Sequence, residues 1–328
     1  MMNNMRNFVL AIMFASVLVM SCDKHGQEME GQPIRFDVVE TKSLATADDI
    51  KSNNSRMTVR GVYEGSSSDL IILFDDQTVT STGSGWTYSP TRYWIPGQTI
   101  RFASVWPGNL GLSLDGDLET KVKMSTFTQA ANYSEQKDLL FANPVSASSG
   151  SVAFDFRHLL SNIRFELDMN APGKSITVTD ISLEDVRNVG TLTMESPDGS
   201  SWTDSWDLTS SMVDLSSGSV SVELEQSGGS FKTIPEDGFI VIPQKVNESS
   251  STTRLVVSVM IENNTTHERE RKAIPATLPQ YGQHGGEWLA GKRIIYRITI
   301  DENTNIIFGK PEVTSWGSTQ TSGAIVIK

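Results

Sequence analysis

The chain of 328 residues has a single cysteine and only four histidines. One thiol cannot form an internal disulfide, and nothing near Cys22 supplies the base or helix N-terminus that lowers the pKa of a catalytic thiol. The histidines lack metal-motif spacing, and there is no nucleophile elbow or glycine-rich phosphate loop. His158, in a predicted strand, is expected to support packing or a hydrogen bond. The sequence therefore predicts no enzyme, no metal and no cofactor.

Positive charge is also scarce. The chain has 27 Lys and Arg residues against 39 Asp and Glu residues, a formal net charge of −12, and its basic residues form no cluster. This balance argues against nucleic acid as a partner and against direct binding to an anionic membrane surface. After residue 20 there is no apolar run long enough to cross a bilayer, which needs about 20 apolar residues.

The first apolar run explains the position of the cysteine. Arg6 precedes an apolar stretch over residues 8–20, and the sequence LVMS stands directly before Cys22. This arrangement resembles a lipobox, where a signal peptide is cut before a cysteine that then carries lipid. We expect residues 1–21 to be a lipoprotein signal peptide and the lipid on Cys22 to hold the protein at the outer membrane. The alternative is an incidental cysteine in an ordinary signal peptide.

The remaining sequence has the pattern of β-strands. Residues 22–32 are polar and are expected to form a tether. Directly after it, Ile34, Phe36 and Val38 alternate with polar residues, as in a half-buried strand. Similar short runs recur at intervals of about 8 to 15 residues, separated by Gly, Asn, Asp and Ser. This rhythm is typical of all-β proteins built from antiparallel sandwiches.

One turn signal divides these strands into two groups. The sequence NAPGKS, residues 170–175, places proline and glycine side by side and is the best candidate for a hinge. We therefore predict two tandem antiparallel β-sandwich domains, over residues 33–170 and 171–328.

Five sequence segments occur in an order that is more specific than any one of them. They are GWTYSPTRYWIPGQTIRFASVWP, DLLFAN, FDFRHLLSNIRFELD, GGEWLAGKRIIYRITID and VTSWGS. In this order, behind a lipobox, they resemble the fimbrillins, the subunits of type V pili, and in particular their Mfa/FimA-like branch. The resemblance covers essentially the whole mature chain. It implies transthyretin-like sandwich domains, a place in the fimbrium at the cell surface, and a role in cell adhesion.

The resemblance also implies a mechanism of assembly. In fimbrillins an arginine-directed surface protease typically removes the tether and the first strand, and the strand of another subunit then fills the exposed groove. Here the removable first strand would carry Ile34, Phe36 and Val38. Arg56 is the better cleavage candidate and Arg60 the fallback, while the alternative is that Arg56 is a plain loop residue. Many members of the family have arginine nearer the first strand, where this chain has a lysine, Lys42.

The end of the chain supplies a candidate donor strand over residues 318–328. Its apolar residues are Ala324, Ile325, Val326 and Ile327. The alternative is that this segment is the last edge strand of its own domain. The partners expected from the resemblance are other fimbrillin subunits and a maturation protease, with host or bacterial surface ligands as further candidates.

Two other functions stay open. Trp202 and Trp206 lie in the polar sequence SWTDSWDL, where exposed rings could bind glycans by stacking, as in a surface glycan-binding lipoprotein. The alternative is that these rings pack in the core. The chain could also be a pilus tip adhesin or an anchor subunit that keeps the lipid on Cys22.

Overall fold

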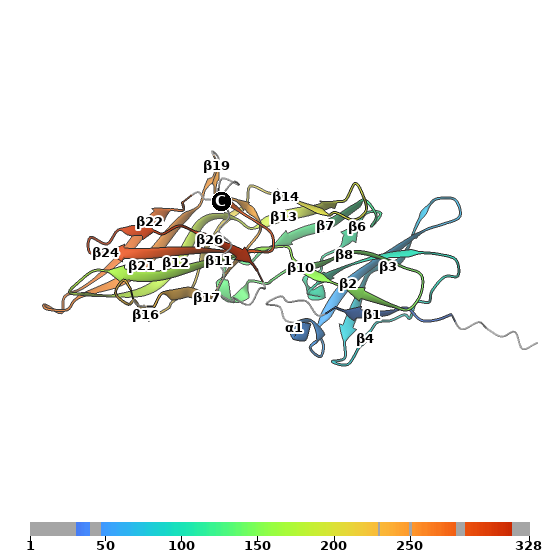
Figure 1. The fold of residues 1–328 in the computed structure, drawn as a ribbon, viewed down its shortest axis with the longest axis horizontal. Helices are drawn as coiled ribbons and strands as arrows, with labels where there is room; N and C mark the ends of the chain where they lie inside the picture. The colour runs from blue at the N-terminus through green and yellow to red at the C-terminus, as the bar shows by residue number, and fades with distance from the viewer. Residues whose placement is uncertain (1–30, 40–46, 229, 249–250, 280–285, 317–328) are drawn as a thin grey trace, which may run out of the picture. The chain divides into compact units, whose positions relative to one another are not determined.

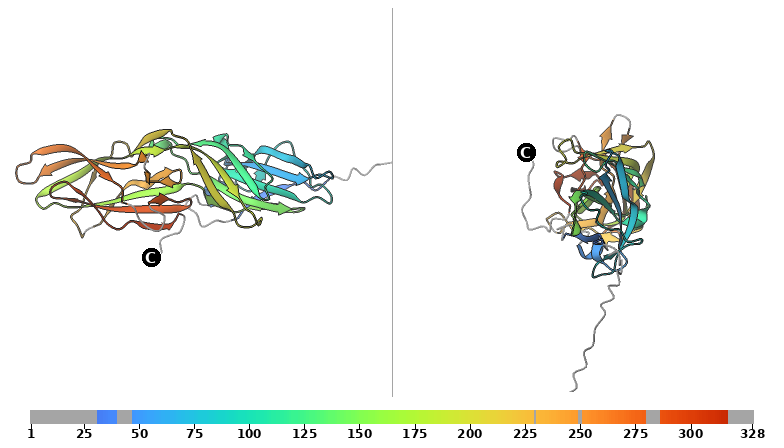
Figure 2. Two further views of the ribbon diagram at one scale, coloured as in Figure 1. Left: turned by 90° about the horizontal axis from the view of Figure 1, so that it is seen from above. Right: turned by 90° about the vertical axis from the view of Figure 1, so that its right-hand side faces the viewer.

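Strands make up nearly all the regular structure of the computed structural model (Figure 2). The structure describes residues 31–39, 47–228, 230–248, 251–279 and 286–316. Helical structure in these ranges is limited to α1 (Ala47–Lys51) and the short 3-10 turns η1 (Gly108–Leu110) and η2 (Tyr133–Glu135). The predicted all-β class is confirmed.

Three sheets contain the strands β1 to β10 together with β13 and β14 (Figure 1). The first pairs β1 (Arg35–Val38) with β9 (Ser151–Phe154). The second has the order β10 (Phe156–His158), β8 (Leu140–Ala147), β5 (Ile100–Trp106), β2 (Arg56–Glu64), β3 (Leu70–Ser81) and β4 (Trp86–Thr87). The third has the order β14 (Thr203–Leu208), β13 (Val189–Glu195), β7 (Lys121–Thr128) and β6 (Leu114–Asp115).

Two five-stranded sheets contain most of the later strands. One has the order β17 (Lys232–Val241), β11 (Ser161–Asn170), β24 (Lys292–Asp301) and β25 (Ile306–Phe308), with β26 (Glu312–Ser315) also on β24. The other has the order β15 (Met212–Ser216), β12 (Lys174–Arg187), β21 (Arg254–Asn263) and β22 (Arg269–Thr277), with β16 (Val222–Glu223) also on β12. Two small pairs are β18 (Gln244–Lys245) with β23 (Glu287–Trp288) and β19 (Asn247–Glu248) with β20 (Ser251–Thr252).

The six-stranded sheet has apolar residues packed on both of its faces. Met57 and Phe102 belong to the hydrophobic cluster shared with β1 and β9, whereas Val62 and Val105 belong to the cluster shared with the four-stranded sheet. Because side chains alternate along a strand, one strand can supply both clusters. The pairing register shifts around Gly61 in β2 and after Phe102 in β5. A third cluster lies between the two five-stranded sheets.

Most strand pairs are antiparallel, as predicted, and two are parallel: β1 with β9, and β11 with β24. Pro172 and Gly173 form the turn between β11 and β12, and Gly173 has a φ of 77°. The division into domains at residues 170 and 171 stays a prediction. The structure adds that β13 and β14 join the sheet of β7, so this hairpin pairs with a strand that precedes residue 170.

Two long runs that the sequence suggests as strands are interrupted. Within GWTYSPTRYW, only Trp86–Thr87 forms a strand, and Tyr93 makes a single bridge to Pro33. Pro90 has no backbone N–H to donate to a ladder, which limits strand structure here. The run VAFDFRHLLSNIRFELDM contributes to three separate strands, β9, β10 and β11, which belong to three different sheets.

Candidate functional site

The first strand, β1, lies in a slot between two other parts of the chain. Strand β9 forms one edge of this slot. The two strands run parallel, in register from Arg35 with Ser151 to Val38 with Phe154. The ladder is extended by Val39, whose N–H donates to the carbonyl oxygen of Phe154 at 2.9 Å. Because β9 is separated from β1 by β2 to β8 in the sequence, this edge is formed entirely by long-range pairing.

The other edge of the slot is formed by residues 92–94. The Ile34 N–H donates to the Arg92 carbonyl at 2.9 Å, and the Trp94 N–H donates to the Gln32 carbonyl at 3.0 Å. The Tyr88 hydroxyl donates to the Ile34 carbonyl at 2.7 Å. Burial raises the pKa of Tyr88, so its hydroxyl remains a donor at neutral pH. Residues 35–39 are therefore hydrogen-bonded to β9 on one side, and Gln32 and Ile34 are hydrogen-bonded to residues 88–94 on the other.

The inward side chains of this segment are part of the core. Ile34, Phe36 and Val38 are 1%, 5% and 2% exposed, whereas Arg35 and Asp37 point to solvent. Figure 1 shows α1 and β4 next to β1, and both elements contact it. The predicted strand and its alternation are confirmed; its removal during maturation stays a prediction.

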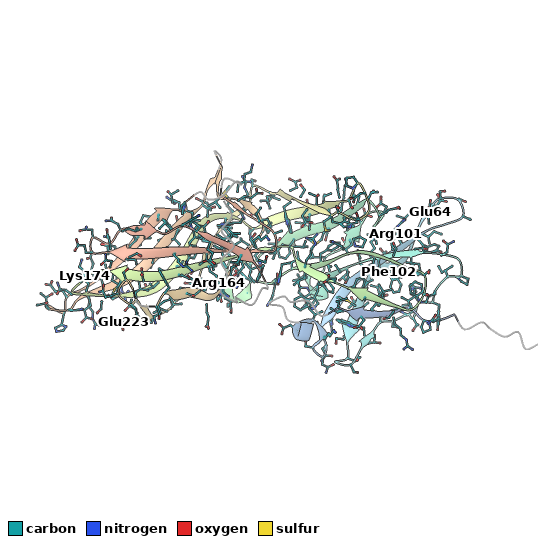
Figure 3. All side chains as sticks on the ribbon, viewed as in Figure 1. Glu64, Arg101, Phe102, Arg164, Lys174 and Glu223 are labelled. Atoms are coloured by element: carbon teal, nitrogen blue, oxygen red, sulfur yellow. The ribbon has the colours of Figure 1, made fainter. Side chains whose placement is uncertain are left out.

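Aromatic rings surround the side chain of Phe36. Figure 3 labels one of them, Phe102, which lies on β5. The distances from the Phe36 ring centroid are 5.3 Å to Phe74, 5.5 Å to Tyr88, 5.8 Å to Phe102 and 5.7 Å to Phe154. Such separations are typical of favourable aromatic pairs. We call the rings of Phe74, Tyr88, Phe102 and Phe154 the ring cage.

The two predicted cleavage residues differ in accessibility. Arg56 is exposed and is the first residue of β2, where it pairs with Thr80. Arg60 is 6% exposed in the same strand, and its guanidinium donates to Asp75 at 3.1 Å and Asp115 at 3.3 Å. A protease could reach Arg60 only after β2 leaves its sheet, whereas Arg56 requires release of the strand's first residues. Cleavage at either residue stays a prediction.

Several predicted features lie outside the described residues. They are the signal peptide 1–21, the lipidation residue Cys22 with most of the tether 22–32, and the donor strand 318–328 with Ala324, Ile325, Val326 and Ile327. In the part of the chain that the structure describes, no helix is long and apolar enough to cross a membrane.

The two tryptophans proposed for glycan stacking contact the core. Trp202 and Trp206 are half-buried and pack against the cluster between the six-stranded and four-stranded sheets. The Trp206 ring lies 6.2 Å from that of Phe127, and its indole nitrogen is buried without a hydrogen-bond partner among the described residues. Neither ring is a fully exposed stacking platform. Glycan binding by these residues stays untested.

His158 is buried and held by its neighbours. Its ring stacks on Trp316 with centroids 4.2 Å apart, and its Nδ1 lies 2.6 Å from Oδ2 of Asp138. Asp138 and Trp316 also line a pocket of about 340 Å³, whose described lining contains no serine, threonine or cysteine nucleophile. Within the described ranges, no three His, Cys, Asp or Glu side chains are grouped so that they could hold a metal ion. The interactions of His158 agree with the packing role predicted for it.

Sequence reasoning identified the strand in the slot but not the residues that hold it. Tyr88 and Arg92 lie in the segment GWTYSPTRYW, of which only Trp86–Thr87 is a strand, and Phe154 is the last residue of β9. The available signal was the concentration of aromatic residues in TYSPTRYW, which predicts burial without predicting the partner.

The fold defines an all-β protein whose first strand lies in a slot formed by distant parts of the chain. The model of the fimbrillin-like family matches residues 45–316. The chain therefore belongs to the fimbrillin-like family. Among curated proteins, none is similar enough to this chain to serve as a relative.

The fold is also similar to solved structures. A fimbrial protein from Bacteroides vulgatus superposes with a TM-score of 0.65 at 17% sequence identity, covering 87% of this chain and 99% of that one. Candidate cell adhesion proteins from Bacteroides uniformis and Bacteroides ovatus superpose with TM-scores of 0.47 each, at 14% and 15% identity. They cover 87% and 89% of this chain and 98% and 99% of their own.

Proposed function

We propose that this chain is a structural pilus subunit that polymerises by donor-strand exchange. It is exported as a lipoprotein, and the lipid on Cys22 holds it at the outer membrane. Cleavage after Arg56 then removes β1. The apolar tail around residues 324–327 of one subunit then fills the slot of the next. The resulting fimbrium contributes to cell adhesion, and the subunit has no enzymatic activity.

The observation that supports this proposal is the way β1 is held. Ile34, Phe36 and Val38 are buried, one edge of the segment is paired with β9, and Gln32 and Ile34 are hydrogen-bonded on the other edge to residues 88–94. Loss of the segment would leave an apolar slot bordered by unpaired backbone groups, which another extended strand can satisfy. Each refilled apolar side chain would contribute about 1.5–3 kcal/mol.

Cleavage by an arginine-specific endoprotease tests the proposal. Arg56 is the only arginine between β1 and the interior of β2. Treatment of the purified mature chain should expose Met57 as a new N-terminus and produce SDS-resistant ladders on a gel. Arg56→Lys keeps the positive charge but removes the cleavage site, so it should give no ladder. A wild-type chain that is cut after Arg56 and remains monomeric would contradict the proposal.

The tail offers a second, matched comparison. Successive residues of a strand face opposite sides, so only one of the sets Ile325 with Ile327 or Ala324 with Val326 can point into the slot. Ile325→Asp and Val326→Asp therefore place the same charge on opposite faces of the strand. We expect one substitution to abolish ladders and the other to leave them nearly unchanged. If both variants form as much ladder as the wild-type chain, the tail is not the donor.

A further inference from the structure

The ring cage around Phe36 is built from side chains that lie outside β1. None of its four rings belongs to β1: they come from β3, β5, β9 and the segment before residues 92–94. Phe74 and Phe102 also contact each other at 5.7 Å, and Phe74 contacts Tyr88 at 5.3 Å. These contacts join three of the cage rings without Phe36, whereas the fourth, Phe154, lies on β9, which pairs with β1.

A glycine allows two of these rings to lie where they do. A Cβ atom on Gly61 would lie 2.9 Å from Cδ2 of Phe74 and 3.0 Å from Cδ1 of Phe102. Both distances are too short for ordinary contact, so the rings pack directly on the backbone of β2. Trp94 and Phe102 also form an edge-to-face pair, with ring centroids 5.9 Å apart and an interplanar angle of 85°. The cage is therefore packed from behind and opens toward β1.

The space inside the cage fits a flat ring better than an aliphatic side chain. The Phe36 ring stacks on Phe154 at an interplanar angle of 14° and lies edge-on to Phe74 and Phe102 at 80°. A branched aliphatic side chain in its place would lose these ring contacts and leave empty space, because close-packed surroundings relax only partly. The neighbouring inward positions hold the aliphatic side chains of Ile34 and Val38.

The candidate donor segment of this chain contains no aromatic residue. Residues 318–328 read STQTSGAIVIK and contain no Phe, Tyr or Trp. Whichever of its faces points inward, isoleucine, valine or alanine would occupy the cage. A strand with an aromatic side chain at its central inward position would fill the cage completely.

We propose that the slot selects an incoming strand with an aromatic side chain at the position of Phe36. The tail 318–328 of a second copy can still fill the slot, as proposed above, but a strand of a different subunit that carries such a ring would bind there more tightly. This selectivity rests on the proposed strand exchange and adds a chemical requirement for the occupant of the slot.

A competition experiment on the nicked full chain tests this selectivity. A recognition sequence for a site-specific protease replaces residues 40–46, so that cleavage leaves β1 in its slot without a covalent link to β2. Labelled peptides are then added, and displacement of the β1 fragment is measured by size exclusion and mass spectrometry. The reference peptide is residues 32–39, with Phe36→Leu and Phe36→Ala versions and the peptide 318–328. A peptide with residues 36 and 37 exchanged has the same composition but turns the ring outward.

We expect the reference peptide to bind at least about tenfold more tightly than the leucine version and at least about 100-fold more tightly than the alanine version. The exchanged peptide and residues 318–328 should compete poorly. If the reference, leucine and 318–328 peptides bind equally, strand exchange stands and the aromatic selectivity is wrong. If no peptide displaces the fragment, the slot accepts no incoming strand, and the proposed function fails together with the selectivity.

Discussion

Removal of β1 should cost the protein a large part of its stability. Its three buried side chains, Ile34, Phe36 and Val38, would each lose about 1.5–3 kcal/mol of burial, which gives a total of about 5–9 kcal/mol. This is an upper bound, because an unfolded chain already buries part of its apolar surface. Natural domains are stable by about 5–15 kcal/mol, so the trimmed chain should be only marginally stable.

Urea unfolding of a polymerisation-deficient chain measures this loss. Deletion of residues 318–328 removes the candidate donor, and further deletion of residues 23–56 gives the trimmed form, which lacks β1 and also the buried Ile50 of α1, so its loss should exceed that of β1 alone. We expect the trimmed form to unfold at a lower urea concentration. Hydrogen exchange should increase mainly in β2, β3, β5 and β9, whose residues form the walls of the slot.

Two substitutions in the untrimmed chain serve as controls. Phe36→Ala should lower the free energy of unfolding by about 3–5 kcal/mol, because it empties the ring cage. Arg35→Ala changes an exposed residue of the same strand and should have an effect within about 0.5 kcal/mol. If the trimmed chain has the same urea midpoint and exchange pattern as the untrimmed one, β1 is not an integral part of the fold, and the reasoning fails.

Three further predictions concern single residues. Gly61→Ala should lower the free energy of unfolding by about 1–3 kcal/mol in urea melts, because the new Cβ would lie 2.9 Å from Phe74; no effect would mean that the ring moves freely. Tyr296→Phe should cost about 1–3 kcal/mol, because the buried indole of Trp288 donates to this hydroxyl at 3.2 Å; an unchanged melting curve would contradict that role. For Asp117, burial raises the pKa but hydrogen bonds from the following loop outweigh it and lower the pKa to about 2. The stability difference between wild type and Asp117→Asn should therefore be full above about pH 4 and shrink as the pH falls toward 2; a difference independent of pH would refute it.

The sequence predicted the parts of the fold that depend on local patterns. Alternation of Ile34, Phe36 and Val38 with polar neighbours is a property of adjacent residues, and β1 follows it. Pro172 and Gly173 marked a turn between two strands for the same local reason. Period-2 alternation shows which face of a strand is buried, but it contains no information about which other strand lies beside it.

The pairing of the strands is what the sequence could not predict. Parallel pairing of β1 with β9 depends on contacts across β2 to β8, and the edge formed by residues 92–94 is irregular. The β13–β14 hairpin pairs with β7, although the turn at Gly173 lies between them in the sequence. Each pairing is decided by the burial of whole sheets, so a residue-by-residue pattern cannot show it. The ring cage could not be predicted from the sequence for the same reason, because its rings come from four separate segments.

The covalent link between β1 and β2 determines when the proposed exchange can begin. A tethered strand has an effective concentration at its own slot on the order of millimolar, whereas a free strand at micromolar concentration is about a thousandfold more dilute. An incoming strand of equal affinity should therefore fail to displace β1 until the chain is cut between residues 39 and 56. Cleavage thus acts as a switch, because it abolishes this concentration advantage.

This reasoning predicts that the uncut chain stays closed in the presence of excess strand. A labelled peptide of residues 32–39 at 50-fold excess, on the order of 0.1 mM, should occupy no more than about one tenth of the intact protein, since the tethered strand has an effective concentration on the order of 1 mM. The same peptide should bind the nicked protein, which has identical residues in the slot and differs only in the broken link. Size exclusion followed by mass spectrometry measures, in both cases, the fraction of the protein that carries the labelled peptide. Equal binding to the intact and nicked proteins would mean that β1 opens without cleavage, so that proteolysis could not control assembly at this slot.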